Sequence, residues 1–176
     1  SQLNVKTIDL AGQQYYAETV FPLALCSDQQ ANKTVIADWI AEHRDQIEDQ
    51  LALTGAILFR GFGLVDDRDF DDFIRAFDWP NFTYAESLSN AVRRNRTELV
   101  FTANEAPPTV SIFLHHEMAQ TPVYPSKLLF FCEHAAKSGG ATPICRSDIL
   151  LQQLREQLPD FVTDCDNKGV RYSQTM

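Results

Sequence analysis

The chain has 176 residues, of which 44% are hydrophobic and 22% are charged, so its length suits one compact domain and is short for two. Asp and Glu number 24 against 15 Lys and Arg, and the resulting net charge of −9 disfavours binding to nucleic acid or to an anionic membrane. The four cysteines form no CxxC pair, which predicts free thiols in a reducing cytoplasm rather than a zinc knuckle or a disulfide scaffold.

Strand and helix patterns alternate in the first half of the chain. The predicted elements there are strands over residues 5–10 and 56–59 and helices over residues 32–51 and 67–77. Asn32 has the side chain of an N-cap, and Gly55 stops the first helical pattern shortly after its end. The first turn of the second helix is acidic, which suits the positive end of the helix dipole.

Proline and asparagine residues interrupt the periodic patterns between residues 78 and 108, so we expect a long irregular region there, of the kind that often carries function. Strand patterns return further on, over residues 110–117, 127–133, 141–145 and 169–172. Between the last two, Ser147 is expected to cap a helix that Pro159 ends.

The best candidates for chemistry lie in the strand predicted over residues 110–117. Ser111, His115 and Glu117 share one face of that strand, and His116 lies on the other. The Cβ atoms of His115 and Glu117 are then about 6–7 Å apart, so the imidazole and the carboxylate can reach one metal ion. Such a His-x-carboxylate pair is the sequential half of the two-His-one-carboxylate arrangement that binds Fe(II). The pair alone is equally compatible with a surface His and Glu on a half-exposed strand.

Further motifs surround this pair. A Gly-Gly-x-Thr turn at residues 139–142 follows it, and an Arg-Gly-Phe sequence at residues 60–62 follows an early strand. Together with the Phe130-Phe131 pair, these motifs make the chain resemble, over about residues 54–172, the TauD/TfdA-type family of Fe(II)- and 2-oxoglutarate-dependent dioxygenases. Glu rather than Asp in the His-x-carboxylate pair is more similar to the clavaminate-synthase-like and syringomycin-type hydroxylases, which act on amino acids or their carrier-bound forms.

The resemblance implies an α+β fold with a mainly β core, formed as a partial double-stranded β-helix (jelly roll) with flanking helices. It implies that Fe(II) and the co-substrate 2-oxoglutarate support hydroxylation of a small organic acid, an amino acid or a carrier-bound amino acid. His115 and Glu117 match the metal ligands, and Thr142 matches the hydroxyl that hydrogen-bonds the 2-oxoglutarate carboxylate farthest from the metal. The positions implied on the substrate side are Ser111, Asn104 and Tyr84.

One departure from the family pattern concerns the third metal ligand, a second His far downstream that precedes an Arg for 2-oxoglutarate. His134 is the only His after Glu117, and it stands before Arg146 at a spacing that imitates that pair. Arg146 directly follows the Gly-Gly-x-Thr turn, however, whereas the family's pair lies on late strands. We therefore expect residues 1–176 to form a single domain that is the N-terminal portion of a longer dioxygenase domain.

Two other interpretations are open at the level of the sequence. A truncated or inactive chain could act only as a binding or interaction domain, and a metal-free α+β domain could carry the His-x-Glu pair by coincidence. The expected partners are a small-molecule or carrier-bound substrate and, through exposed strands, a second copy of the chain. The basic cluster formed by Arg93, Arg94 and Arg96 is either a solvated loop or a contact for an anionic substrate or an acidic carrier protein.

Overall fold

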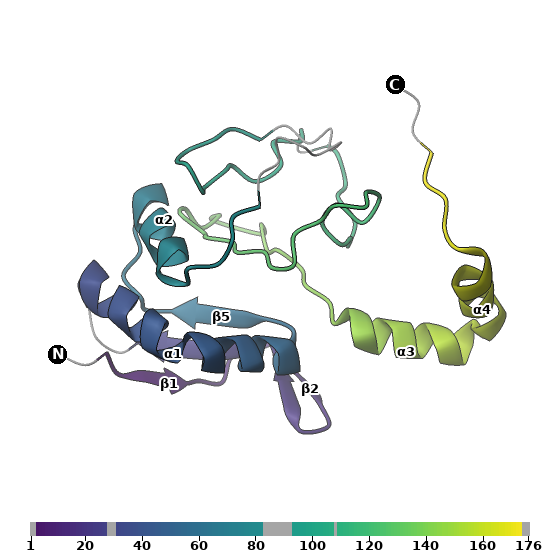
Figure 1. Cartoon of the computed structure of the whole chain (residues 1–176), viewed down its shortest axis with the longest axis horizontal. Coiled ribbons are helices and arrows are strands. Elements are labelled where there is room, and N and C mark those ends of the chain that lie inside the picture. The colour runs from purple at the N-terminus through teal and green to yellow at the C-terminus, as the bar shows by residue number, and fades with distance from the viewer. Residues whose placement is uncertain (1–2, 28–30, 83–92, 108, 174–176) are drawn as a thin grey trace.

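The computed structural model describes residues 3–27, 31–82, 93–107 and 109–173, and it has the mixed α+β class expected from the sequence. The elements in chain order are β1 (Val5–Thr7), β2 (Gln14–Tyr16), β3 (Thr19–Phe21), β4 (Leu23–Ser27), α1 (Lys33–Thr54), β5 (Ile57–Arg60), α2 (Asp67–Ala76), α3 (Ser147–Gln157) and α4 (Pro159–Lys168). A three-stranded sheet has the order β1-β4-β5, and β2 and β3 form a separate hairpin. In Figure 1, α1 runs along the sheet and α2 packs next to α1.

The pairing of β4 with β5 sets the arrangement of the N-terminal part. The two strands are parallel, with Leu23 opposite Ile57 and Leu25 opposite Phe59. Parallel neighbours in one sheet need a long crossover connection, and α1 supplies it. The sheet face that carries these apolar side chains is thereby covered by the helix that connects its strands.

Both ends of α1 are where the sequence predicts them. The Asn32 side chain accepts a hydrogen bond from the N–H of Val35, which satisfies one of the free donors in the first turn. Gly55 adopts the left-handed conformation at φ +81°, and its N–H donates to the Leu51 carbonyl. These local contacts determine where the helix begins and where it ends.

Aromatic side chains from β5, the turn after it and α2 form the centre of the core. Phe59 contacts Phe62, Phe73 and Phe77, with ring centroids 5.4, 5.4 and 6.3 Å apart and the rings edge to face. Phe70, Phe73 and Phe77, which are three or four positions apart, thus form the buried face of α2 and its C-cap. The other buried members of the core are Leu3, Leu23, Leu25, Ile36, Trp39, Ile40, Ile47, Phe70 and Val100.

A buried carboxylate on α2 anchors a segment that follows the core elements in the chain. Asp71 is 7% exposed and accepts hydrogen bonds from the Arg75 guanidinium, the Thr97 hydroxyl and the Leu99 N–H. Burial raises the pKa of the Asp71 carboxyl, but the three hydrogen bonds outweigh burial and hold the pKa below its ordinary value. Residues 94–102, which fold back on themselves, are thereby attached to α2.

The strands predicted in the second half of the chain are not formed as strands. The corrected segments, all within the described residues, are 110–117, 127–133, 141–145 and 169–172. A strand requires a neighbour that supplies its hydrogen bonds, and alternation in sequence does not provide one. Residues 127–131 nevertheless keep the alternation, because Leu129 and Phe131 pack against the core whereas Leu128 and Phe130 are exposed.

The helices α3 and α4 project away from the sheet in Figure 1. The helix predicted from Ser147 is confirmed as α3, although Arg146 is its N-cap and no side chain caps it. As predicted, α3 ends directly before Pro159, with Leu158 as its C-cap, but Pro159 also begins a further helix that the sequence did not predict. It is the first residue of α4, where its missing N–H would have no helical partner in any case.

The Arg146 side chain joins the start of α3 to the N-terminal part of the fold. Its guanidinium pairs with Asp148 at 2.6 Å and also donates to the Thr19 hydroxyl at 3.3 Å and the Leu53 carbonyl at 3.4 Å. The Arg146 partner lowers the pKa of the Asp148 carboxyl to about 2. Arg146 therefore has a structural role in this part of the fold.

Two further properties concern the whole of the described chain. Within it, no helix combines the length and the apolar character needed to cross a bilayer. The cysteines are free thiols, as the sequence predicts, at Cys26, Cys132, Cys145 and Cys165.

Replacing Gly61 tests the close approach between the turn after β5 and the end of β4. Gly61 has φ +72°, and a Cβ there would lie 2.3 Å from the Ser27 carbonyl oxygen. We expect Gly61→Ala to cost about 3 kcal/mol or more of unfolding free energy, from the left-handed backbone and the clash together. Gly12→Ala is the matched control, because Gly12 has φ +86° and open space around it, so only about 1 kcal/mol is expected. Equal losses in urea melts would contradict the close approach.

Replacing Asp71 tests the buried carboxylate. We expect Asp71→Asn to lower the unfolding free energy at neutral pH by about 1.5–3 kcal/mol, because charge-assisted hydrogen bonds are lost. Since the Asp71 pKa is lowered in the folded state, its contribution is present above the unfolded-state pKa and is lost as the pH falls through the folded-state pKa. The variant should therefore lose less stability on acidification than the wild type does, as measured by thermal melts across pH.

The neighbouring Asp72 provides the control for that experiment. It pairs with Lys33 on the surface, where both side chains are exposed. Asp72→Asn should cost less than about 1 kcal/mol. If Asp72→Asn were as destabilising as Asp71→Asn, the hydrogen bonds to Asp71 would not be what holds residues 94–102 in place.

Candidate metal centre

The His115 imidazole is held by its own backbone in the tautomer that metal ligands use. Its Nδ1 lies 2.7 Å from the Phe113 carbonyl oxygen. A carbonyl oxygen can only accept, so Nδ1 carries the proton and the neutral ring keeps its lone pair on Nε2. The His115 side chain is 58% exposed, so the ring is accessible from solvent.

One oxygen of the Glu117 carboxylate is hydrogen-bonded to an arginine, and the other lies near the His115 imidazole. Oε1 accepts a hydrogen bond from the Arg93 guanidinium at 2.8 Å, and Oε2 lies 4.0 Å from Nε2 of His115. The side chains of Arg93 and Glu117 are only 18% and 14% exposed. A charge-assisted hydrogen bond between two side chains with so little solvent exposure is strong and fixes the orientation of the carboxylate.

The chain turns sharply directly after Glu117. Met118 has φ +58°, in the left-handed region that residues with a Cβ rarely adopt, and its side chain is buried. Its carbonyl accepts hydrogen bonds from both the N–H and the hydroxyl of Thr121, at 3.0 and 3.1 Å. The buried side chain and these two hydrogen bonds hold the turn, so the backbone at Glu117 has a defined place.

His116 has a different environment from His115. Its Nε2 is hydrogen-bonded to the Ser147 hydroxyl at the start of α3. The sequence predicts that the two histidines lie on opposite faces of a strand, but this segment is not a strand. The two histidines differ instead in their neighbours, because His115 faces Glu117 and His116 is hydrogen-bonded to Ser147 of α3.

The other predicted site residues lie in irregular, exposed stretches. Ser111, Asn104 and Thr142 are all exposed, and the described contacts of His115 and Glu117 do not include them. Tyr84 lies outside the described residues. The structure therefore brings together the two predicted metal ligands, whereas Ser111, Asn104 and Thr142 stay predictions for the substrate and 2-oxoglutarate sides.

The basic cluster seen in the sequence consists of intramolecular ion pairs. Arg94 pairs with Glu105 at 3.2 Å, and Arg96 pairs with Asp67 at 2.8 Å. Arg93 pairs with Glu117, which neither interpretation of the cluster anticipated. No local pattern identifies this pair, because its two residues are 24 positions apart.

Comparison with known proteins identifies the family. The family model described as "Taurine catabolism dioxygenase TauD, TfdA family" matches residues 19–175. The chain belongs to the TauD/TfdA family. It is similar to a clavaminate synthase-like protein of Arabidopsis thaliana, 34% identical over 171 residues that make up 93% of this chain and 51% of the relative. It is also similar to a dapdiamide synthesis protein of Enterobacter agglomerans, 33% identical over 126 residues, or 72% of this chain and 37% of the relative. The chain thus spans about half, or less, of the curated relatives it matches.

Membership of the TauD/TfdA family implies Fe(II) chemistry, and the donor atoms of His115 and Glu117 suit that metal. Two ligands bound at a right angle, each about 2.1 Å from the metal, lie about 3.0 Å apart. Nε2 and Oε2, at 4.0 Å, therefore need to approach each other to share an ion. Within the described residues, no three His, Cys, Asp or Glu side chains gather around one point. The residues present fit two of the three protein positions in the family's metal site.

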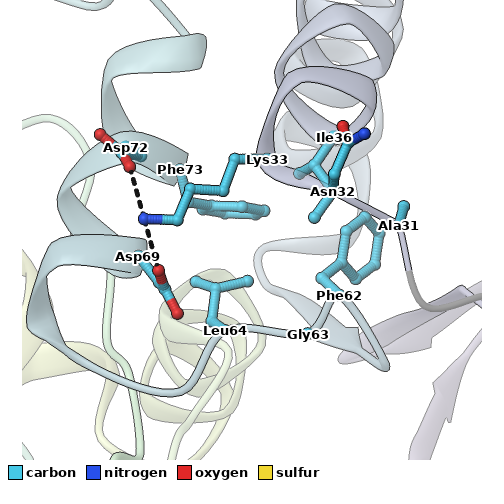
Figure 2. Close-up of a pocket in the computed structure, with 10 residues that line it drawn as sticks. All are labelled: Ala31, Asn32, Lys33, Ile36, Phe62, Gly63, Leu64, Asp69, Asp72 and Phe73. Carbon is cyan, nitrogen blue, oxygen red and sulfur yellow. Dashed lines mark hydrogen bonds and ion pairs between the residues drawn. The ribbon is translucent and has the colours of Figure 1, made fainter.

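A hollow in the described part of this TauD/TfdA chain lies elsewhere, between α1 and α2. It has a volume of about 210 Å³, and Figure 2 shows the Lys33 amine reaching across it to Asp69 and Asp72. The Nζ atom lies 2.6 Å from Asp69 and 3.0 Å from Asp72, and these partners raise the pKa of Lys33 while the same hydrogen bond lowers the pKa of Asp69. The Lys33 amine compensates part of the charge of the two carboxylates, and these ion pairs join α1 to α2.

Proposed function

We propose that this chain supplies His115 and Glu117 as two metal ligands of an Fe(II)- and 2-oxoglutarate-dependent dioxygenase. One observation carries the proposal, namely the hydrogen bond from His115 Nδ1 to the Phe113 carbonyl, which keeps the lone pair on Nε2 beside Glu117 Oε2. Metal-binding histidines usually donate their other ring N–H to such a carbonyl. A coincidental surface pair does not require this arrangement.

Each residue has a different proposed role in such a site. When bound, Fe(II) together with 2-oxoglutarate and dioxygen supplies the oxidation of an unactivated C–H bond. His115 offers a neutral nitrogen donor, and Glu117 offers the negative charge that partly compensates the cation. We assign the Thr142 hydroxyl to the 2-oxoglutarate carboxylate farthest from the metal, and the exposure of Thr142 supports its availability. Ser111, Asn104 and Tyr84 are proposed to contact the substrate.

The proposed substrate is a small organic acid, an amino acid or a carrier-bound amino acid. The names of the two relatives, which refer to clavaminate synthase and to dapdiamide synthesis, support a small-molecule substrate. The net charge of −9 argues against a nucleic-acid or membrane partner. The free thiols support a reducing, cytoplasmic setting for the reaction.

We further propose that residues 1–176 are the N-terminal portion of a jelly-roll domain. Two observations support this. Within the described residues, no third His, Cys, Asp or Glu joins His115 and Glu117 to complete a three-ligand site, and apolar side chains such as Phe113 and Phe130 are exposed. The alternative is a chain that acts only as a binding or interaction domain, associating with a second copy through the same exposed residues.

Metal titration of the chain tests the ligand assignment. With two protein ligands, we expect anaerobic Fe(II) binding with a dissociation constant above about 1 μM, and His115→Ala or Glu117→Ala should weaken it at least about tenfold. The control is His116→Ala, which removes the adjacent histidine and should leave the affinity unchanged. Sub-micromolar binding that His115→Ala does not alter would show the assignment to be wrong.

An activity assay separates the enzyme from the binding domain. Succinate formation from 2-oxoglutarate, with Fe(II) and dioxygen, is measured for this chain and for any longer protein that contains it. Activity that depends on His115 supports the dioxygenase. The absence of succinate from both proteins, even at saturating Fe(II), would favour the binding or interaction domain.

A further inference from the structure

The ion pair between Arg93 and Glu117 differs from the other arginine pairs near the candidate metal centre. Arg94 is 74% exposed and Arg96 is 45% exposed, so their ion pairs contribute little. Arg93 and Glu117 are both largely buried and are hydrogen-bonded at 2.8 Å. An arginine in this position has a substantial effect on the carboxylate that it holds.

As a result of this pair, the two oxygens of Glu117 have different neighbours. The Arg93 guanidinium occupies Oε1, whereas Oε2 is the oxygen that faces Nε2 of His115 at 4.0 Å. A charge-assisted hydrogen bond of this kind fixes the orientation of the carboxylate. His115 is oriented in the same manner, by the Phe113 carbonyl on the far side of its ring.

We propose that Arg93 is a positioning residue that fixes the orientation of the Glu117 carboxylate, with Oε2 on the side of His115 Nε2. The inference rests on the proposed function of His115 and Glu117 as metal ligands, and it adds a residue that acts through one of them. Hydrogen-bonded partners of this kind typically change metal affinity by about 10–100-fold.

The direction in which metal affinity changes on removal of Arg93 distinguishes positioning of Glu117 from simple charge repulsion. Arg93 is a cation, so if it acted only by repelling a metal ion, its removal would make the metal bind more tightly. If Arg93 acts by orienting Glu117, its removal makes the metal bind more weakly. The two mechanisms therefore predict opposite changes in the dissociation constant.

Titration with Co(II), followed by its visible absorption, measures both affinity and coordination. We expect Arg93→Met to weaken binding by about 10–100-fold and to change the Co(II) spectrum, because the carboxylate loses its fixed orientation. Arg93→Lys should restore binding to within about threefold of the wild type, since an ammonium can still donate to Oε1. Arg94→Met is the matched control, and it should alter neither the affinity nor the spectrum.

The outcomes that overturn the inference are separate from those that overturn the proposed function. A folded Arg93→Met variant that binds Co(II) as tightly as the wild type, or more tightly, overturns the role of Arg93 and leaves the ligands untouched. Unchanged binding by both His115→Ala and Glu117→Ala overturns the proposed function itself. If Arg93→Met does not fold, Arg93→Leu, which also cannot donate a hydrogen bond to Oε1, takes its place, and unchanged affinity in that variant likewise overturns the inference.

Discussion

The buried carboxylate of Asp71 connects the core of this protein to its candidate metal centre. It lies on α2, whose apolar face packs into the aromatic core, and it holds the segment 94–102 through Thr97 and Leu99. Arg93 stands at the beginning of that segment and reaches Glu117. Asp71 thus holds against α2 the segment that directly follows Arg93, the partner of Glu117.

Charge in this protein is organised mainly by pairing acidic residues with a small number of arginines and lysines. The excess of acidic residues would destabilise a compact chain through mutual repulsion if they were clustered without counter-ions. Arg75, Arg93 and Arg146 each hold a carboxylate and also join two parts of the chain. A cation placed at His115 and Glu117 would therefore enter a region in which positive and negative side chains are already balanced, so orientation matters there as much as charge.

The helices could be predicted from the sequence because their signals are local. Asn32 begins α1 and Gly55 ends it through contacts within a few residues, and apolar residues at helical spacing identify α2. The strands predicted for the second half do not form in the described residues, since a strand needs hydrogen-bond partners from distant segments that local alternation does not supply. Pro159 is compatible with ending one helix and with starting another. His115 and Glu117 are predicted from their spacing together with the motifs around them, whereas Arg93 is not predicted as the partner of Glu117, because only the folded chain brings the two together.

The crossover through α1 also affects the order in which the chain folds. β4 and β5 are joined by a segment that is mostly one helix of 22 residues, so formation of α1 removes most of the free backbone that their pairing would otherwise have to constrain. Helices form in about a microsecond or less, well before non-local strand pairing. The caps at Asn32 and Gly55 thus stabilise an early species, and weakening them should slow refolding in addition to lowering stability.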